Sequence, residues 1–237
     1  MELVWQGILK AIELVLGGDR EIWAITWLSI KISGSATLIS LIFGIPLGIA
    51  LALTRFPGRA FVAALLNTGM GLPPVVVGLF ISVALWRSGP LGFFDLIYTP
   101  SAMIIAQVVI ALPIVAGLTM ASFQSLYPHL ALQLLGIGAS KVQTLWLLCN
   151  EARLPLLAAV MAGFGGVISE VGASMMVGGN IRGQTRVLTT ATVLETGKGN
   201  FDVAIALGLI LLALCFAFNC FLTRLQQKGQ MKWPRLS

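Results

Sequence analysis

The stretch from Ile32 to Thr54 holds 23 residues without a charge. At about 1.5 Å per residue, a helix of this length crosses the roughly 30 Å hydrocarbon core of a bilayer. Charged residues make up 10% of the chain and the mean hydropathy is +0.94, whereas soluble domains carry about a quarter charged residues. The chain is therefore predicted to be an all-α integral membrane protein.

Four further apolar runs predict five spans in a single membrane domain covering residues 1–237. These runs are 60–86, 101–125, a run that begins at Pro155, and 203–223. Residues 1–30 precede the first span and repeat apolar side chains at helical spacing, which is typical of an amphipathic helix on a membrane surface. Gly17 and Gly18 should end that helix, and Asp19 can cap the next one.

Basic residues are distributed unevenly between the two sides that five spans create. One side has eight basic residues and one acid, whereas the other has seven of each. Because cytoplasmic loops are enriched in Lys and Arg, the first side is predicted to be cytoplasmic, with the N-terminus outside and a short tail at 224–237 inside. The eight basic residues are Arg55, Arg59, Lys141, Arg153, Arg224, Lys228, Lys232 and Arg235.

The net charge of +6 follows from this topology, so no nucleic-acid partner is indicated. Cys149, Cys215 and Cys220 lie in apolar or membrane context without metal-ligand spacing, which indicates neither a disulfide framework nor a metal site. The N-terminus starts with an acid and lacks the basic region of a cleaved signal peptide.

The second span contains the sequence GLPPVVVG at 71–78. Pro73 and Pro74 cannot both lie in a regular helix interior, because proline removes a backbone donor and clashes with the preceding turn. A break at membrane depth is tolerated where it is buried in protein or lines a cavity. The motif is therefore a candidate element of a translocation path, and a purely structural kink is the alternative.

Residues 126–155 form a partly polar, helical excursion between two spans. A GAS turn at 138–140 is followed by Lys141 and, further on, by Glu151 and Arg153. Two interpretations stay open at this point: an ordinary interfacial loop, and a docking surface for a soluble partner.

Glu170 is the only acid predicted inside a span, where a carboxylate costs a few kcal/mol. It could line a path. The structural alternative is that it pairs with Arg182 or Arg186, or accepts hydrogen bonds from Asn180, Gln184 or Thr185. The nearest approach to a nucleotide-binding P-loop, ETGKGN at 195–200, lacks the first Gly and the final Ser or Thr. His129, the only histidine, is interpreted as an interfacial residue without a catalytic role.

Three stretches in their order along the chain resemble the permease subunits of type I ABC importers, and within them the oxyanion branch. The stretches are GLPPVVVG at 71–78, SEVGASMMVGGNIRGQT at 169–185, and FDVAIALGLILL at 201–212. The short five-span form with an amphipathic start is most similar to bacterial tungstate-uptake permeases. The resemblance covers nearly the whole chain.

The resemblance implies that the excursion at 126–155 is a coupling helix that rests in a cleft of an ATPase subunit. Leu132-Gln133-Leu134 stands where the family has Glu-Ala-Ala, and the following loop is longer by about one helical turn. Contacts made by the family's glutamate are therefore not carried over. The residues predicted to contact the ATPase or to brace the loop are Gly138, Ala139, Ser140, Lys141, Gln143, Glu151, Arg153 and Pro155.

The resemblance also implies a path and an outer gate near the two motifs that flank the coupling loop. Segments 87–100 and 178–200 are expected to face outward, for docking and gating. The residues assigned to the path or gate are Pro73, Pro74, Glu170, Gly172, Asn180, Gly183 and Thr185.

The implied function is import of a tetrahedral oxyanion, tungstate first and then molybdate or sulfate, across the inner membrane. The implied partners are a second copy of the chain, a cytoplasmic ABC ATPase dimer that binds ATP and Mg, and an extracytoplasmic oxyanion-binding protein. The chain itself is expected to hold no cofactor and to catalyse no reaction. The alternative is a secondary transporter driven by an ion gradient, for which the broken second span is the best feature.

Overall fold

The computed structural model describes residues 2–228, apart from the side chains of residues 2–4, 127–129, 131, 132, 135 and 228. Most of the predicted tail at 224–237 and the side chains of His129 and Leu132 therefore lie outside the described part. The helices are α1 (Glu2–Leu16), α2 (Arg20–Leu53), α3 (Arg59–Met70), α4 (Pro74–Leu85), η1 (Gly92–Phe94), α5 (Pro100–Gly136), α6 (Lys141–Glu151), α7 (Arg153–Ile168), α8 (Gly172–Gly178), α9 (Leu188–Gly197) and α10 (Phe201–Lys228).

Helices α2, α5 and α10 are each long and apolar enough to cross a membrane. Two bent pairs, α3 with α4 and α6 with α7, pass the same test together, which gives up to five spans. The all-helical fold and the number of spans agree with the sequence prediction. Both α2 and α5 run through their internal prolines, Pro46 and Pro113, without a break.

The first membrane helix starts earlier than the sequence analysis placed it. Gly18, with a φ of +67°, separates it from α1. The Asp19 carboxylate then accepts hydrogen bonds from the backbone N–H groups of Glu21 (2.9 Å) and Ile22 (3.1 Å). This cap begins the helix at Arg20, because it satisfies backbone donors that have no partner within the helix. Residues 20–31 are thus the start of the long apolar helix, and the separate N-terminal helix α1 ends at Leu16.

Small residues let α2 and α5 pack at close range. A Cβ atom added to Gly44 would lie 3.0 Å from the Val115 side chain, and one on Gly48 would lie 2.5 Å from the Ala116 carbonyl oxygen. This contact confirms the close approach that the Gly44-xxx-Gly48 spacing predicts.

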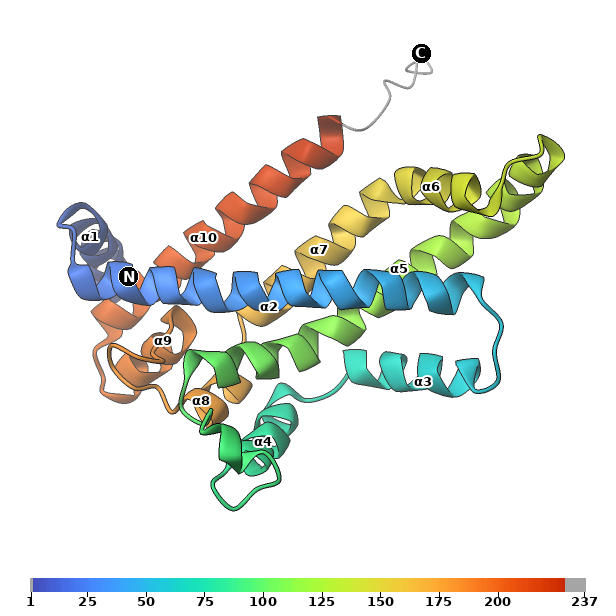
Figure 1. The fold of residues 1–237 in the computed structure, drawn as a ribbon. Coiled ribbons are helices and arrows are strands. Elements are labelled where there is room, and N and C mark those ends of the chain that lie inside the picture. Colours follow the sequence, from blue (N-terminus) through green and yellow to red (C-terminus); the bar gives the residue numbers. More distant parts are fainter. Residues whose placement is uncertain (1, 229–237) are drawn as a thin grey trace, which may run out of the picture.

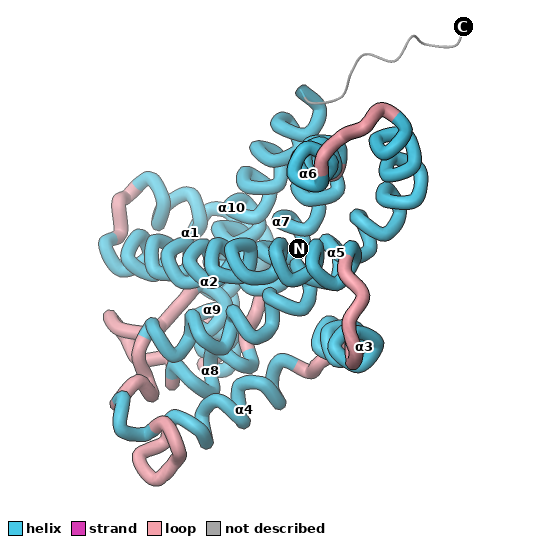
Figure 2. The backbone as a smooth tube through the Cα atoms, turned by 45° about the vertical axis from the view of Figure 1, so that its right-hand side comes forward, coloured by secondary structure: helices cyan, strands magenta, loops and turns pink. Residues whose placement is uncertain are grey.

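The bundle has two ends, one toward the right and top of Figure 1 and the other toward its left and bottom. The loop between α2 and α3 lies at the right, the turn between α5 and α6 at the upper right and the last turns of α10 at the top, whereas α1 and α9 lie at the left and the loop between α4 and α5 at the bottom. We call these the α6 end and the α1 end. In the turned view of Figure 2, most loops lie toward the same two ends, and the connection between α3 and α4 lies between them. The grouping matches the alternation of five spans.

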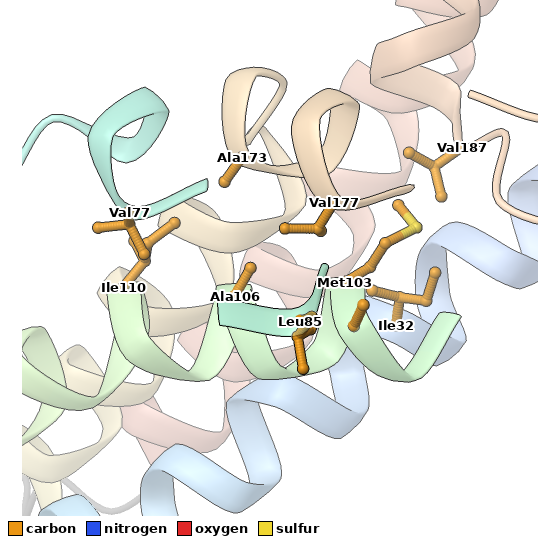
Figure 3. Close-up of a cluster of buried hydrophobic side chains, with 10 residues drawn as sticks. Ile32, Val77, Leu85, Met103, Ala106, Ile110, Ala173, Val177 and Val187 are labelled. Carbon is orange, nitrogen blue, oxygen red and sulfur yellow. The ribbon is translucent and has the colours of Figure 1, made fainter. Parts of the chain in front are cut away.

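A core near the α1 end joins elements that are distant in the sequence (Figure 3). Met103 from α5 and Ile32 from α2 are both fully buried there. They pack with Val77 of α4 and Val177 of α8 in one cluster, which also includes Val187 just before α9. This cluster holds both broken regions of the chain against α5.

Candidate functional site: a coupling turn and two broken helices

The turn between α5 and α6 is stabilised by its own backbone. The φ of Gly138 is +75°, a left-handed conformation that glycine adopts without steric cost. Ala139 N–H donates a 3.0 Å hydrogen bond to the Leu134 carbonyl oxygen, which closes the end of α5. A Cβ on Gly138 would meet no atom within 4 Å, so the backbone conformation alone accounts for the glycine.

Ser140 begins α6 through a reciprocal capping box. Its hydroxyl accepts a hydrogen bond from Gln143 N–H at 3.3 Å, and the Gln143 side-chain oxygen accepts one from Ser140 N–H at 2.8 Å. The two bonds satisfy two donors that otherwise lack a helical partner. Gly138, Ala139, Ser140, Lys141 and Gln143 are therefore brought together in one ordered turn.

One face of this turn is apolar and exposed. Ile137 and Val142 are each 78% exposed and Trp146 is 67% exposed. Val142 and Trp146 are four residues apart and therefore lie on the same face of α6. We call these three residues the α6 patch. The sequence analysis missed the patch, although two apolar residues at this spacing inside a polar loop were a signal for it.

The opposite face of α6 is anchored in the bundle. Leu148 is fully buried and packs in a cluster with Phe123 of α5 and with Ala152. Helices α6 and α7 meet at a bend of 60°. Glu151 and Arg153 flank this bend and Pro155 lies in the first turn of α7. These three residues are therefore at the far end of α6, and Glu151 lies about 15 Å along the helix axis from Lys141.

The double proline changes the direction of the chain by more than a kink. Helix α3 ends at Met70, and α4 begins at Pro74 with an angle of 105° between them. Pro74 occupies the first position of α4, where its missing N–H would be unpaired in any case. Pro73 has a φ of −62° and precedes the helix in an extended conformation. The break therefore directs α4 away from α3 and against α8.

The second break lies between α7 and α8, at Glu170. The sequence analysis placed this residue within a continuous span, but α7 ends at Ile168 and α8 begins at Gly172. A Glu170 carboxylate oxygen accepts a 3.0 Å hydrogen bond from Ala173 N–H, and the Glu170 carbonyl oxygen accepts one from the Thr189 hydroxyl at 3.0 Å. Glu170 thus stabilises the break, because its carboxylate accepts a hydrogen bond from a backbone N–H group of the first turn of α8 that has no partner within the helix.

The predicted pairing of Glu170 with Arg182 or Arg186 is wrong. Arg182 donates from Nε to a Glu21 carboxylate oxygen at 2.8 Å and from Nη2 to the other oxygen, while Arg186 lies 3.6 Å from the same carboxylate. The bonds and the charge of Glu21 raise the pKa of Arg182. Glu21 lies at the start of α2 and faces the loop that carries both arginines. The Glu170 carboxylate instead accepts a hydrogen bond from the backbone of α8.

The two breaks touch one another. A Cβ on Gly172, the first residue of α8, would lie 2.5 Å from Cγ2 of Val75 in the first turn of α4. One turn further on, a Cβ on Gly78 would lie 2.7 Å from the Cα of Ala173. The structure therefore brings Pro73, Pro74, Glu170 and Gly172 into one region.

The motif GN-x-x-G-x-T forms a closed turn next to this region. Thr185 is fully buried; its hydroxyl donates to the Gly178 carbonyl oxygen and accepts a 2.9 Å hydrogen bond from Ile181 N–H. Asn180 has a φ of +53° and donates a 3.3 Å bond from its side chain to the Thr190 carbonyl oxygen. Gly183 has a φ of +74°. These residues link α8 to α9, and much of the expected outer connection at 178–200 is the partly buried helix α9.

Known proteins resemble this chain in fold and in sequence. Solved structures with a similar fold include the inward-facing MetNI methionine ABC transporter (TM-score 0.71, 18% identity, covering 90% of this chain and 95% of that one) and an amino acid ABC transporter with histidines (TM-score 0.69, 14% identity, 90% and 96%). Residues 44–229 match the family described as binding-protein-dependent transport system inner membrane component. The chain belongs to that family.

Several relatives within this family of ABC importer permeases match most of the chain. The tungstate uptake system permease protein TupB of Peptoclostridium acidaminophilum is 39% identical and covers 96% of this chain and 100% of its own. A probable anion ABC transporter permease protein of Haloferax volcanii is 39% identical over 86% and 90% of the two chains. The molybdenum transport system permease protein ModB of Escherichia coli is 28% identical over 77% and 84%. These relatives are named as permease components, and the family is that of inner-membrane transport subunits.

Proposed function

We propose that this chain is the membrane subunit of an ATP-driven importer of tungstate, with molybdate and sulfate as less favoured substrates. The observation that carries the proposal is the 39% identity to the tungstate uptake permease of Peptoclostridium acidaminophilum over 96% of this chain. Relatives named for molybdenum and sulfate transport support the wider class of tetrahedral oxyanions.

The α6 end is proposed as the cytoplasmic face, where an ABC ATPase dimer binds ATP and Mg and contacts the turn at Gly138. Two features support this assignment: the α6 patch is exposed, and Leu148 fixes the other face of α6 in the bundle. Together they would allow α6 to transmit a movement of the ATPase to α5 and α7. Glu151 and Arg153 would brace the return of the loop. A reporter fused after Ser237 is expected in the cytoplasm, and an external reporter would overturn the orientation.

The α1 end is proposed to face an extracytoplasmic binding protein that delivers the anion. Two copies of the chain would enclose the path, and rigid-body movement of the pair would open it alternately to each side. The contact between α4 and α8 supports a gate there, because both helices begin at a break and touch through glycines. Arg182 and Arg186 are engaged with Glu21, which supports a path lined by hydroxyls and helix ends instead of fixed cations.

Transport by the purified parts tests the proposal. Vesicles that contain this chain with its ATPase and binding protein should take up tungstate when ATP is present on the side of the membrane where the ATPase lies. Excess molybdate should compete more strongly than excess sulfate. Uptake by the permease alone, driven by an ion gradient without the ATPase, would instead establish the secondary transporter. If excess sulfate competed as strongly as excess molybdate, the proposed order of substrates would be contradicted.

A further inference from the structure

The first three turns of α2 and the loop at 182–186 line an open pocket of about 530 Å³ at the α1 end. Four of the residues that line it are basic: Arg20, Lys31, Arg182 and Arg186. One lining residue, Glu21, is acidic. We call this open pocket the α2 pocket. The residues of its wall come from positions more than 150 apart in the sequence, so the charge is concentrated by the fold.

The acids near the α2 pocket are already engaged. Glu21 is shared between Arg182 and Arg186, and Asp19 accepts two backbone hydrogen bonds at the start of α2. Glu195, whose carboxylate also interacts with the charge of Arg186, binds Lys198 and Asn200, and these contacts lower its pKa. The lining therefore keeps a net charge of +3, counted as four cations and one carboxylate.

Some of the cationic groups have no partner among the residues that the structure describes. No ion pair or side-chain hydrogen bond involves Arg20 or Lys31 within that part of the chain, and the buried Nε of Arg186 has no acceptor there. An unpaired buried donor of a charged group is costly. An anion that entered the α2 pocket would provide an acceptor for the exposed side chains of Arg20 and Lys31.

The depth of the α2 pocket in the membrane suggests where that anion comes from. Helix α2 has 34 residues and is therefore about 51 Å long, which exceeds the roughly 30 Å hydrocarbon core. Residues 32–54 carry no charge and are long enough to fill that core, so we place the first turns, which carry Arg20, Glu21 and Lys31, in the headgroup region. Trp23 and Trp27 are 54% and 68% exposed on these turns, as expected of an interfacial aromatic belt. Lys31 lies about 16 Å below Arg20 along the axis and can extend its amine toward the headgroups.

We propose that the α2 pocket binds the phosphate group of an anionic phospholipid. Its basic residues match a phosphate, for which arginine and lysine are the usual partners. Apart from Glu21, Gly183 and Gln184, the rest of its wall is apolar and comes from Ala24, Ile25 and Leu28 together with exposed Trp27. A phospholipid can place its phosphate against the basic residues and its apolar part against the apolar wall, whereas a free oxyanion can contact the basic residues alone. The inference does not depend on which solute the chain transports.

Native mass spectrometry of the complete complex, purified in detergent with added lipid, tests this site. The wild-type protein should retain phosphatidylglycerol and release phosphatidylcholine at the same concentration. The double variant Arg20→Gln with Lys31→Gln removes the two unpaired cations without disturbing the Glu21 pairs. Its retention of phosphatidylglycerol should be lower than that of the wild type by about tenfold or more, because each basic residue near a headgroup contributes a favourable charge interaction.

The matched control is Lys10→Gln with Arg87→Gln, which removes two charges at the same end but outside the α2 pocket. This control should retain phosphatidylglycerol as the wild type does, and melting temperatures in phosphatidylcholine should agree for all three proteins. Equal retention of the two lipids, or an equal loss in both double variants, would overturn the proposal. Displacement of phosphatidylglycerol by millimolar inorganic phosphate or tungstate would assign the site to a free oxyanion and would also overturn it.

Discussion

A side chain added to Gly78 would place its Cβ 2.7 Å from the Cα of Ala173. The backbones of α4 and α8 are therefore in direct contact, at the point where the two broken regions of the chain meet. Glycine permits this approach because it has no Cβ. This contact makes α4 and α8 one packed unit next to the core that contains Val77 and Met103.

Gly78→Ala is expected to separate α4 from α8, because a backbone atom cannot yield to the new methyl group. Overpacking of this kind costs about 1–3 kcal/mol, so the melting temperature in detergent and the rate of tungstate uptake should both fall. Gly34→Ala is the matched control, since a Cβ at Gly34 meets no atom within 4 Å. If Gly78→Ala and Gly34→Ala lost uptake to the same degree, the contact between α4 and α8 would not be the cause of the loss.

Gly138→Ala is expected to reduce the stimulation of the partner ATPase by substrate-loaded binding protein. An L-residue pays about 1–2 kcal/mol in the left-handed conformation that Gly138 adopts, so the turn before Ser140 should change shape. Gly136→Ala serves as the control, because Gly136 ends α5 without a positive φ and also has open space around it. ATPase activity of the assembled complex is the measurement. Normal stimulation in Gly138→Ala would refute the role of the turn in coupling.

Trp146→Ala should weaken the binding of the ATPase subunit. Exposed aromatic residues at the centre of an interface commonly contribute about 2 kcal/mol or more, which corresponds to roughly a thirtyfold weaker complex. Co-purification of the ATPase at decreasing protein concentration would measure the change. Trp23→Ala, at the α1 end and 54% exposed, removes the same side chain far from the α6 patch and should leave the complex intact. An identical affinity for both variants would exclude the α6 patch from the interface.

Two substitutions at Glu170 distinguish a structural role from a charged one. Glu170→Gln keeps an oxygen that accepts from Ala173 N–H, so transport and stability should stay close to the wild type. Glu170→Ala removes that acceptor and is expected to cost about 0.5–2 kcal/mol, as the loss of a helix cap does. Melting temperature and tungstate uptake are measured together. Inactive but stable Glu170→Gln protein would show that the negative charge itself is required.

Local chemistry along the chain was sufficient to predict the helical membrane fold. The charge-free run before Arg55, the Gly17–Gly18 break and the Asp19 cap act within a few residues, so each was readable in order. The spacing of Gly44 and Gly48 is likewise typical of a close helix contact, but it does not identify α5 as the partner. The position of the turn at Gly138 followed from the GAS sequence, and its capping box involves residues only three apart.

Contacts between distant segments were decided by the tertiary structure alone. Glu21 and Arg182 are 161 residues apart, and the sequence analysis named Glu170 as a partner instead, because a sequence shows charge but not direction. The same limit applies to the meeting of Val75 with Gly172, which depends on a 105° bend that two prolines permit but do not orient. Burial of Thr185 and exposure of Trp146 reverse the order that polarity suggests, because the folded bundle determines which side chains water and lipid can reach.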